Sequence, residues 1–253
     1  MFIVFFKKDK PMKHIFFKTI LATLVVLAVL VPGCSRAGSA LNGSGQIVVQ
    51  ELKAAEFNSI NIKGAFEVEV SQAESYKVVL STDSNLLSRI RVSLEHKTLK
   101  LSIEAPATFF PTSLKIKIAL PEMVGLNLSE GAKGVITNFH LSDHFSLFLA
   151  GDSTLNGAFE ADQIAFNLSD ASSVSLSGTA TYLDLDCKGG SKVDLGRLAL
   201  TAAQIRLREA SEATLNVVGR FDATLNDASK VYYLGNPLFT NISVSDGSTM
   251  IHK

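Results

Sequence analysis

The sequence predicts an all-β protein: a right-handed β-helix, or solenoid-like stack, of coils about 19 residues long, with a β-layer at its N-terminal end. Three observations predict this fold. Small residues recur at nearly constant intervals in the second half of the chain, apolar and polar residues alternate around each of them, and residues 57–120 alternate without that repeat. No helical periodicity competes in the repeated half, so strands are the regular structure expected there.

The N-terminal segment has the composition of an export signal. Residues 7–18 are basic, and an almost continuously apolar run extends from Ile15 to Cys34. A charged start, a short apolar run and small residues at its end are typical of a signal peptide, and this run is short for a membrane-spanning helix. We therefore predict a signal peptide over residues 1–33. Either Met1 or Met12 can be its start, because residues 12–34 form a complete signal by themselves.

The signal ends in VPGC, which resembles the lipobox of bacterial lipoproteins at Val31, Gly33 and Cys34. The resemblance implies that Cys34 is lipidated and holds the mature protein to a membrane. An ordinary secretory signal with an incidental cysteine is the alternative. Ser35 after the cysteine implies an outer-membrane lipoprotein, with the domain on the periplasmic side or at the cell surface. Residues 34–56 are then a flexible Gly/Ser-rich tether and a lead-in strand, and residues 57–253 are the folded domain.

The repeat is anchored on the small residue that closes each Ser-Asp-Ala-Ser-like phrase. The intervals between anchors are 21, 19, 19, 20, 18 and 19 residues, and the anchors are Ala132, Ser153, Ser172, Ser191, Ser211, Ser229 and Ser248. A repeat this short and regular indicates a solenoid in which each repeat is one coil.

One polar column lies between two apolar columns ahead of the anchors. Four residues before the anchors stand Leu128, Leu149, Leu168, Cys187, Leu207, Leu225 and Val244. One residue earlier, in the mostly polar column, stand Asn127, Phe148, Asn167, Asp186, Arg206, Thr224 and Ser243. This alternation is that of a strand with one buried face, and it resumes after most anchors, so each coil holds two short strands. Coils stack about 4.8 Å apart, which places Cys187 in an aliphatic ladder as a small buried hydrophobe.

The Ser-Asp-Ala-Ser phrase is predicted to form the bend between the two strands of a coil. Asp and Ser side chains that hydrogen-bond to nearby backbone N–H groups stabilise sharp bends, and Gly or Ala keeps them narrow. Stacked acidic residues repel one another by about 1 kcal/mol in a water-like dielectric. Calcium could bridge them, but one carboxylate per coil supplies fewer ligands than calcium-binding nonapeptide β-helices have. Whether an ion binds this column is not decided by the sequence.

Residues 57–120 predict a β-layer that is continuous with the rod and caps its first coil. A bare coil edge would invite aggregation, so such a cap is expected. Alternation is cleanest over residues 66–70 and 114–120. The interruptions predicted between strands are turns at Gly64, residues 72–75 and residues 95–97, one helical turn within residues 84–92, and a loop at residues 105–113 that exposes Phe109 and Phe110.

The order of these motifs resembles that of a known family. The stretches FNSINIKGAFEVEVSQ, DSNLLSRIRV and ALPEMVGLNLSEGAKGV, with the returning LSDAS, REAS and NDAS phrases, look like the putative auto-transporter adhesin, head GIN domain family. The resemblance covers residues 57–253, although Ser-Asp or Ser-Glu often stands where the family commonly has Ser-Gly. It implies a β-helical fold, often carried on exported lipoproteins, and an adhesin label.

Composition and motifs argue against several other classes. Lys+Arg and Asp+Glu both number 24, so no electrostatic signature for nucleic acid is present. No nucleophile elbow, phosphate-binding loop or Cys/His cluster is found, and we predict no cofactor and no metal. His140, Asp143 and His144 stand together, but four residues of a strand span about 13 Å, which is too far for one metal ion.

Asp184 and Asp186 share one outward strand face about 7 Å apart. That separation is compatible with the paired carboxylates of an inverting glycosidase. Alternating acids on an exposed strand are more often a solvated face, and Arg206, one coil further on, can pair with Asp186. We therefore predict no catalytic residue, and a polysaccharide lyase or hydrolase is kept as the alternative.

The favoured hypothesis is a lipid-anchored, non-enzymatic β-helix that presents a polar strand face for adhesion or envelope interaction. This face suits an extended glycan, an envelope polymer or a protein partner, and no nucleic acid is expected. A structural spacer or assembly partner, oligomeric through the terminal coil at residues 248–253, is a further alternative. The candidate binding residues are Asn127, Asn167, Asp184, Asp186, Arg206 and Thr224.

Overall fold

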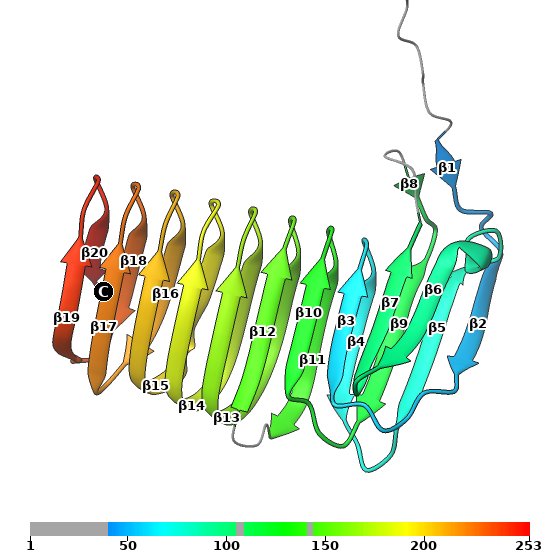
Figure 1. The fold of residues 1–253 in the computed structure, drawn as a ribbon, viewed down its shortest axis with the longest axis horizontal. Coiled ribbons are helices and arrows are strands. Elements are labelled where there is room, and N and C mark those ends of the chain that lie inside the picture. The colour runs from blue at the N-terminus through cyan, green and yellow to red at the C-terminus, as the bar shows by residue number, and fades with distance from the viewer. Residues whose placement is uncertain (1–39, 105–108, 141–143) are drawn as a thin grey trace, which may run out of the picture. The chain divides into compact units, whose positions relative to one another are not determined.

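The structure, a computed structural model, describes residues 40–104, 109–140 and 144–253 (Figure 1). The predicted signal peptide and the candidate lipidation residue Cys34 lie outside these residues. Within them, no helix has the length and apolar character that a membrane span requires.

The repeated half of the chain is a β-solenoid of about six turns, with coils of about 20 residues, which confirms the predicted fold class. In each coil the chain runs along a strand of one layer, turns sharply and runs back along a strand of the other layer (Figure 1). The strands are β10 (Gly125–Ser129), β11 (Lys133–His140), β12 (His144–Ala150), β13 (Thr154–Leu168), β14 (Ser173–Cys187), β15 (Lys192–Leu207), β16 (Glu212–Val217), β17 (Arg220–Leu225), β18 (Lys230–Leu234), β19 (Leu238–Val244) and β20 (Thr249–His252). The long strands β13, β14 and β15 continue through the wide bend from one layer to the other.

The apolar columns stack in register inside the solenoid, as predicted. Leu168 of β13 pairs with Cys187 of β14, and Cys187 pairs with Leu207 of β15. All three side chains are fully buried. Alternating strands with one apolar face bury that face only when neighbouring coils keep the same register, so the sequence repeat and the parallel register support each other.

The sharp corners are tight turns with two consecutive residues at positive φ. Asp170 and Ala171 have φ of 56° and 61°, and Glu209 and Ala210 have φ of 56° and 57°. The Ser172 N–H donates to the Ser169 carbonyl at 3.4 Å, so the corner has the closing hydrogen bond of a β-turn. Positive φ at both central positions is the signature of the type I′ turn, which favours Asp, Asn and Gly.

The role of the aspartate in the Ser-Asp-Ala-Ser phrase therefore differs from the one predicted. The Asp170 carboxylate accepts a hydrogen bond from the Ser169 hydroxyl at 2.9 Å rather than from a backbone N–H. Asp is favoured because it tolerates the left-handed region better than most residues. The closing serine points inward: Ser172 is fully buried, and its N–H donates to Ser191 Oγ of the next coil at 3.2 Å.

The N-terminal region forms the predicted cap, continuous with the rod. Strand β3 pairs in parallel with both β7 and β10, and β4 pairs in parallel with both β9 and β11. The elements are β1 (Leu41–Asn42), β2 (Ile47–Leu52), β3 (Ser59–Lys63), β4 (Glu67–Gln72), β5 (Lys77–Asp83), the 3-10 turn η1 (Leu87–Arg89), β6 (Ile90–Glu95), β7 (Thr98–Ile103), β8 (Phe109–Phe110) and β9 (Leu114–Leu120). The turns at Gly64 and at residues 95–97, and the helical turn within residues 84–92, lie where the sequence predicts them.

The coils of this region do not stack in chain order. The coil formed by β3 and β4 lies between the coil formed by β7 and β9 and the coil formed by β10 and β11. Antiparallel strands make this order possible: β5 pairs with β9, β2 pairs with β5, and β6 pairs with β7. They also cover the first coil, which is how the edge of the solenoid is closed.

The segment expected as a loop around Phe109 and Phe110 contains a short strand. Phe109 and Phe110 form β8, which pairs with β1. Phe110 is 63% exposed, as predicted, but Phe109 is half-buried and packs against the core. Asp83 holds this region to the lead-in segment, because its carboxylate accepts hydrogen bonds from the backbone N–H groups of Gly45 at 2.8 Å and Thr112 at 2.8 Å. Residues 105–108 lie outside the described residues.

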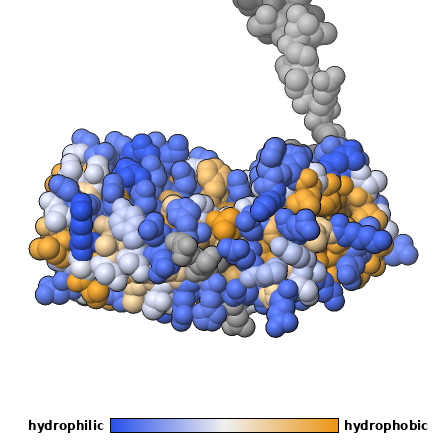
Figure 2. Space-filling model, turned by 60° about the horizontal axis from the view of Figure 1, so that its bottom comes forward, coloured by the Kyte–Doolittle hydropathy of each residue, from blue (hydrophilic) through white to orange (hydrophobic). Residues whose placement is uncertain are grey.

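Exposed apolar side chains gather at the two ends of the solenoid. Figure 2 shows a mostly hydrophilic face with hydrophobic residues over the N-terminal cap and near the C-terminal coil. The large exposed hydrophobic residues of these two ends are Ile47, Val49, Val92 and Leu94 in the cap and Leu238, Phe239, Ile242, Val244 and Ile251 in the last coil. Polar side chains cover most of the length between them, which is where the candidate binding residues lie.

The buried thiol of Cys187 is expected to make the folded protein less stable at alkaline pH. Burial raises the pKa of the Cys187 thiol from 9.0 to about 11. Between these values the folded protein keeps a proton that the unfolded chain has lost, so stability is complete below pH 9 and falls as the pH rises toward about 11. At about 1.4 kcal/mol per pKa unit, we expect the free energy of unfolding to fall by an amount on the order of 2 kcal/mol across this range.

Urea unfolding at pH values from 8 to 11 measures this effect. Cys187→Ala is the matched variant, since it lacks the thiol while retaining every other titrating group. Its free energy of unfolding should be lower at neutral pH, because of the smaller side chain, but should depend less on alkaline pH. The same alkaline slope in both proteins would contradict the assignment to Cys187.

Candidate functional site

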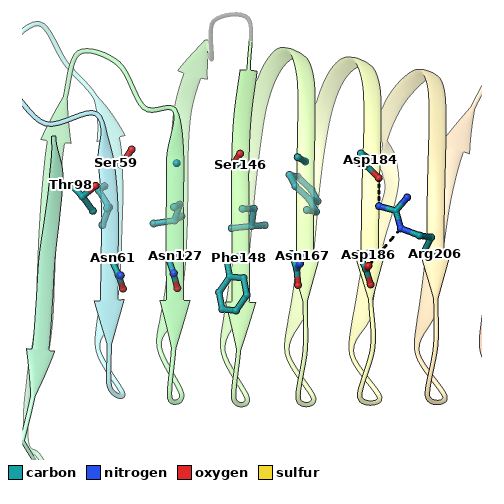
Figure 3. Close-up of a pocket in the computed structure, with 16 residues that line it drawn as sticks. Ser59, Asn61, Thr98, Asn127, Ser146, Phe148, Asn167, Asp184, Asp186 and Arg206 are labelled. Atoms are coloured by element: carbon teal, nitrogen blue, oxygen red, sulfur yellow. Dashed lines mark hydrogen bonds and ion pairs between the residues drawn. The ribbon is translucent and has the colours of Figure 1, made fainter. Parts of the chain in front are cut away.

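A shallow groove of about 480 Å³ crosses one layer of the solenoid. Its floor consists of outward-facing positions of successive coils, from β7 and β3 at one end to β14 and β15 at the other (Figure 3). Because successive strands are parallel and in register, residues at the same position of the repeat lie side by side across the groove. The predicted polar column thus becomes a row of side chains along the solenoid.

The central row of the groove contains one side chain from each coil. Its members are Asn61, Asn127, Phe148, Asn167, Asp186 and Arg206, and each is the register partner of the next. Thr224 is the register partner of Arg206 and is exposed, but it lies beyond the lining of the groove. The structure therefore brings together all the predicted binding residues except Thr224.

The groove is hollow because a second row, two residues earlier in each strand, has small side chains at its centre. Gly125, Ser146 and Ala165 are register neighbours there. On one side of them the row continues with Ser59 and on the other with Asp184. Thr98, the register partner of Ser59, and Asp184 are the larger side chains at the two ends of this row. The small side chains between them leave space above the backbone of β10, β12 and β13 (Figure 3).

Phe148 is a functional candidate that the sequence reasoning missed, as is Asn61 at the far end of the row. Phe148 lies in the central row between Asn127 and Asn167, and its side chain projects from the same face as theirs (Figure 3). It is 39% exposed, which is unusual for a phenyl ring in an otherwise polar row. The signal was present in the sequence, because Phe148 is the only aromatic residue of its column.

The amides beside Phe148 are available to a ligand. Within the described part of the chain, the side chains of Asn127 and Asn167 make no hydrogen bond to another protein group. A primary amide offers two N–H donors and one carbonyl acceptor. Together with Phe148, these residues present an apolar ring with hydrogen-bonding groups on both sides.

Two carboxylates and two arginines form a paired cluster at one end of the groove. Arg206 Nη2 donates to Asp184 Oδ1 at 2.8 Å, and Arg206 Nε lies 3.6 Å from Asp186 Oδ2. Arg208 Nη2 donates to Asp186 Oδ1 at 2.7 Å. Arg206 thus lies beside Asp186, as expected, but its shorter bond is to Asp184. All four side chains are partly exposed, so each pair contributes little to stability.

This cluster does not have the arrangement of a glycosidase site. An inverting glycosidase needs one carboxyl group that carries a proton to donate and one carboxylate that activates a water molecule. Asp184 and Asp186 both accept hydrogen bonds from arginine instead. The geometry favours a surface that orients a ligand over one that cleaves it.

The histidines considered as metal ligands are held by different partners. His140 Nδ1 lies 3.1 Å from Glu160 Oε2, and His144 Nε2 lies 3.1 Å from Ser146 Oγ. Among the described residues, no three His, Cys, Asp or Glu side chains are grouped closely enough to hold a metal ion. Asp143, the third member of the predicted cluster, lies outside those residues.

Asp222 has a structural role that the sequence did not indicate. In the pairing of β17 with β19, two residues, Thr240 and Asn241, lie opposite Asp222 and form a bulge. The Asp222 carboxylate accepts hydrogen bonds from the Thr240 hydroxyl, from Arg220 and from the Asn241 backbone N–H at 2.9 Å. The hydrogen bonds from Thr240 and Arg220 lower the pKa of Asp222 to about 2. Asp222 therefore joins the last two coils and is not a free acid of the groove.

Fold and groove together define a β-solenoid with a capped N-terminal end and a polar strand face that several coils share. Residues 56–237 match the family model described as "Putative auto-transporter adhesin, head GIN domain". The chain belongs to this family, which confirms the resemblance seen in the order of its motifs.

Three solved structures with the same fold come from species of Bacteroides and Parabacteroides. A putative adhesin from Bacteroides fragilis is 20% identical, with a TM-score of 0.75 over 85% of this chain and 100% of that one. A putative lipid binding protein from Parabacteroides distasonis is 16% identical, with a TM-score of 0.71 over 85% and 99%. A putative adhesin from Parabacteroides merdae is 13% identical, with a TM-score of 0.65 over 85% and 99%. At these identities the likeness shows the fold alone, and none of the curated proteins matches the chain.

Proposed function

We propose that this protein is an exported, lipid-anchored adhesion module without enzymatic activity, and that it binds an extended ligand along the groove. The observation that carries the proposal is the central row. Side chains from successive coils form one continuous surface, so a ligand that follows the solenoid can contact several coils at once. A surface repeated in this way suits a polymer better than a compact small molecule.

The family and the N-terminal sequence support the two other parts of the proposal. The family model and two of the similar structures carry adhesin names, the third carries a lipid-binding name, and none of them carries an enzyme name. The lipobox-like VPGC at residues 31–34 supports an anchor on Cys34, and Ser35 after the cysteine supports a location in the bacterial outer membrane, on the periplasmic side or at the surface. A tether after Cys34 would let the domain reach a ligand away from the membrane.

Blocking the groove should abolish binding without unfolding the protein. Ala165 lies on the groove floor in β13, so Ala165→Arg fills the space and adds a charge. We expect the full-length protein to bind at least one member of a panel of glycans, envelope polymers and extended peptides, and we expect Ala165→Arg to weaken that binding at least tenfold. Microarray screening followed by titration calorimetry measures both.

The lipid anchor is tested separately, in bacterial cells that express the protein. There, Cys34→Ser should move the protein from the membrane fraction to the soluble fraction and prevent lipid labelling.

Ala158→Arg is the matched control for Ala165→Arg, because Ala158 lies in the same strand and is exposed away from the groove. It should bind within about twofold of the wild type. The proposal fails if no panel member binds above background, or if the two arginine variants bind equally. An unchanged membrane fraction for Cys34→Ser would overturn the anchor while leaving the groove untouched.

A further inference from the structure

We propose that the groove binds a neutral, unbranched carbohydrate chain that lies along the solenoid. One sugar ring stacks on Phe148, and hydroxyl groups of the chain form hydrogen bonds with Asn127 and Asn167. This inference rests on the proposed function, because it names the ligand class of the same groove. Four features of the groove support it: the Phe148 ring, the two amides, the paired charges and the spacing of the central row. Each of them narrows the chemical class of ligand that can bind.

The exposed phenyl ring of Phe148 favours a ligand that has an apolar face. Phe148 keeps 39% of its surface exposed, while the small side chains of Ser146 and Ala165, which also line the groove, leave room beside it. Covering an exposed phenyl ring is favourable, because apolar area is removed from water. A pyranose ring presents C–H groups on its face and hydroxyl groups around its edge. Such a ring can cover Phe148 while its edge remains polar.

The flanking amides fit the hydroxyl edge. Asn127 and Asn167 are the register partners of Phe148 on its two sides, and their amides have no partner among the described residues. A hydroxyl group both donates and accepts a hydrogen bond, as a primary amide does. Each amide can therefore exchange hydrogen bonds with the sugar on the ring or with one of its neighbours along the chain.

Charge pairing argues for a neutral ligand. Two carboxylates of the groove, Asp184 and Asp186, are matched by two guanidinium groups, Arg206 and Arg208. An anionic polymer would meet the carboxylates, and a cationic polymer would meet the arginines. Either would have to break pairs that are already formed, whereas hydroxyl groups can bond to the rim of the cluster without breaking them.

Spacing separates a carbohydrate from an extended peptide. Equivalent side chains of neighbouring coils lie about 4.8 Å apart, the separation of paired strands. An extended peptide rises about 3.3 Å per residue and repeats its side-chain direction about every 6.6 Å, so it falls out of step with the coils after one or two of them. A chain of linked pyranose rings advances by roughly one ring width per unit, close to the coil spacing, and stays in step across the groove.

Titration calorimetry with the full-length protein tests the inference. The probes are neutral β-linked hexasaccharides of glucose, xylose and N-acetylglucosamine, an oligogalacturonate of equal length, and a polar twelve-residue peptide. We expect at least one neutral hexasaccharide to bind, at least tenfold more tightly than the oligogalacturonate or the peptide. Phe148→Ala should weaken that binding at least tenfold, while Phe148→Tyr, which keeps the ring, should bind within about threefold of the wild type.

Phe110→Ala is the matched control, because Phe110 is an exposed phenylalanine in β8, outside the groove. It should leave binding unchanged, and unfolding curves of all variants should show that each one folds. The inference is overturned if the peptide or the oligogalacturonate is the tighter ligand, or if Phe148→Ala binds the hexasaccharide as the wild type does. In those cases sensitivity to Ala165→Arg would preserve the proposed function. Absence of any binding, or binding that Ala165→Arg does not affect, would overturn both.

Discussion

Replacing Phe145 with alanine should lower the free energy of unfolding by about 3 to 5 kcal/mol, the range for a fully buried phenylalanine. Phe145 lies in β12 with no exposed surface. Its ring centroid is 5.9 Å from that of Phe159 and 6.4 Å from that of Phe166, and the second pair is edge to face. The truncation would leave a cavity among the three rings of β12 and β13 and remove both ring contacts. Urea unfolding followed by circular dichroism measures the loss.

Phe148→Ala is the matched control for this prediction. Phe148 is in the same strand, three residues further on, but it faces outward and is 39% exposed. Its removal should cost less than about 1 kcal/mol, as for most surface substitutions, while it should weaken ligand binding. Equal losses of stability in the two variants would contradict the inward and outward assignment of β12.

Gly178→Ala should cost about 3 kcal/mol or more, because a side chain at this position meets backbone of the preceding coil. Gly178 lies in β14 with φ of 120°, a conformation that L-residues rarely adopt. A Cβ atom there would lie 1.9 Å from the carbonyl oxygen of Phe159. That carbonyl belongs to the strand next in the stack, so the coils would have to separate to relieve the overlap. Thermal and urea unfolding report the loss.

Gly190→Ala separates this overlap from the cost of positive φ. Gly190 also has positive φ, 69°, but nothing lies within 4 Å of the position that its Cβ would take. Its replacement should cost only about 1 kcal/mol, the penalty of the left-handed conformation. If Gly178→Ala were no worse than Gly190→Ala, the close stacking of β13 and β14 at this bend would be wrong.

The ladder of Leu168, Cys187 and Leu207 shows what a repeat makes predictable. Their spacing of about one coil, and the polar residues on either side of each, predicted both their burial and their stacking. The structure confirms both, because parallel coils in register bury equivalent positions together. The outward row follows from the same register, which is why the sequence predicts that Asn167, Asp186 and Arg206 lie side by side.

Other features depend on the path of the chain and on side-chain size. No local pattern distinguishes β3, which lies inside the stack, from β7, which lies one coil further out. The corners were predicted as bends, but not as turns with positive φ at both Asp170 and Ala171. The partner of Asp184 was also missed, because Arg206 can reach either carboxylate and only its side-chain direction selects the shorter bond.

The coil, its two strands and the sharp corner between them follow from the sequence alone, because alternation and turn residues act over a few neighbours along the chain. The sequence also determines which side chains face outward, since that follows from a period of two. The groove that the outward side chains form is visible only once the coils are stacked. The hollow is lined by Gly125, Ser146 and Ala165, and the charge pairs lie at its end. Both features depend on side chains of neighbouring coils, which are about 20 residues apart in the chain, so their sizes and directions matter only after the coils have stacked.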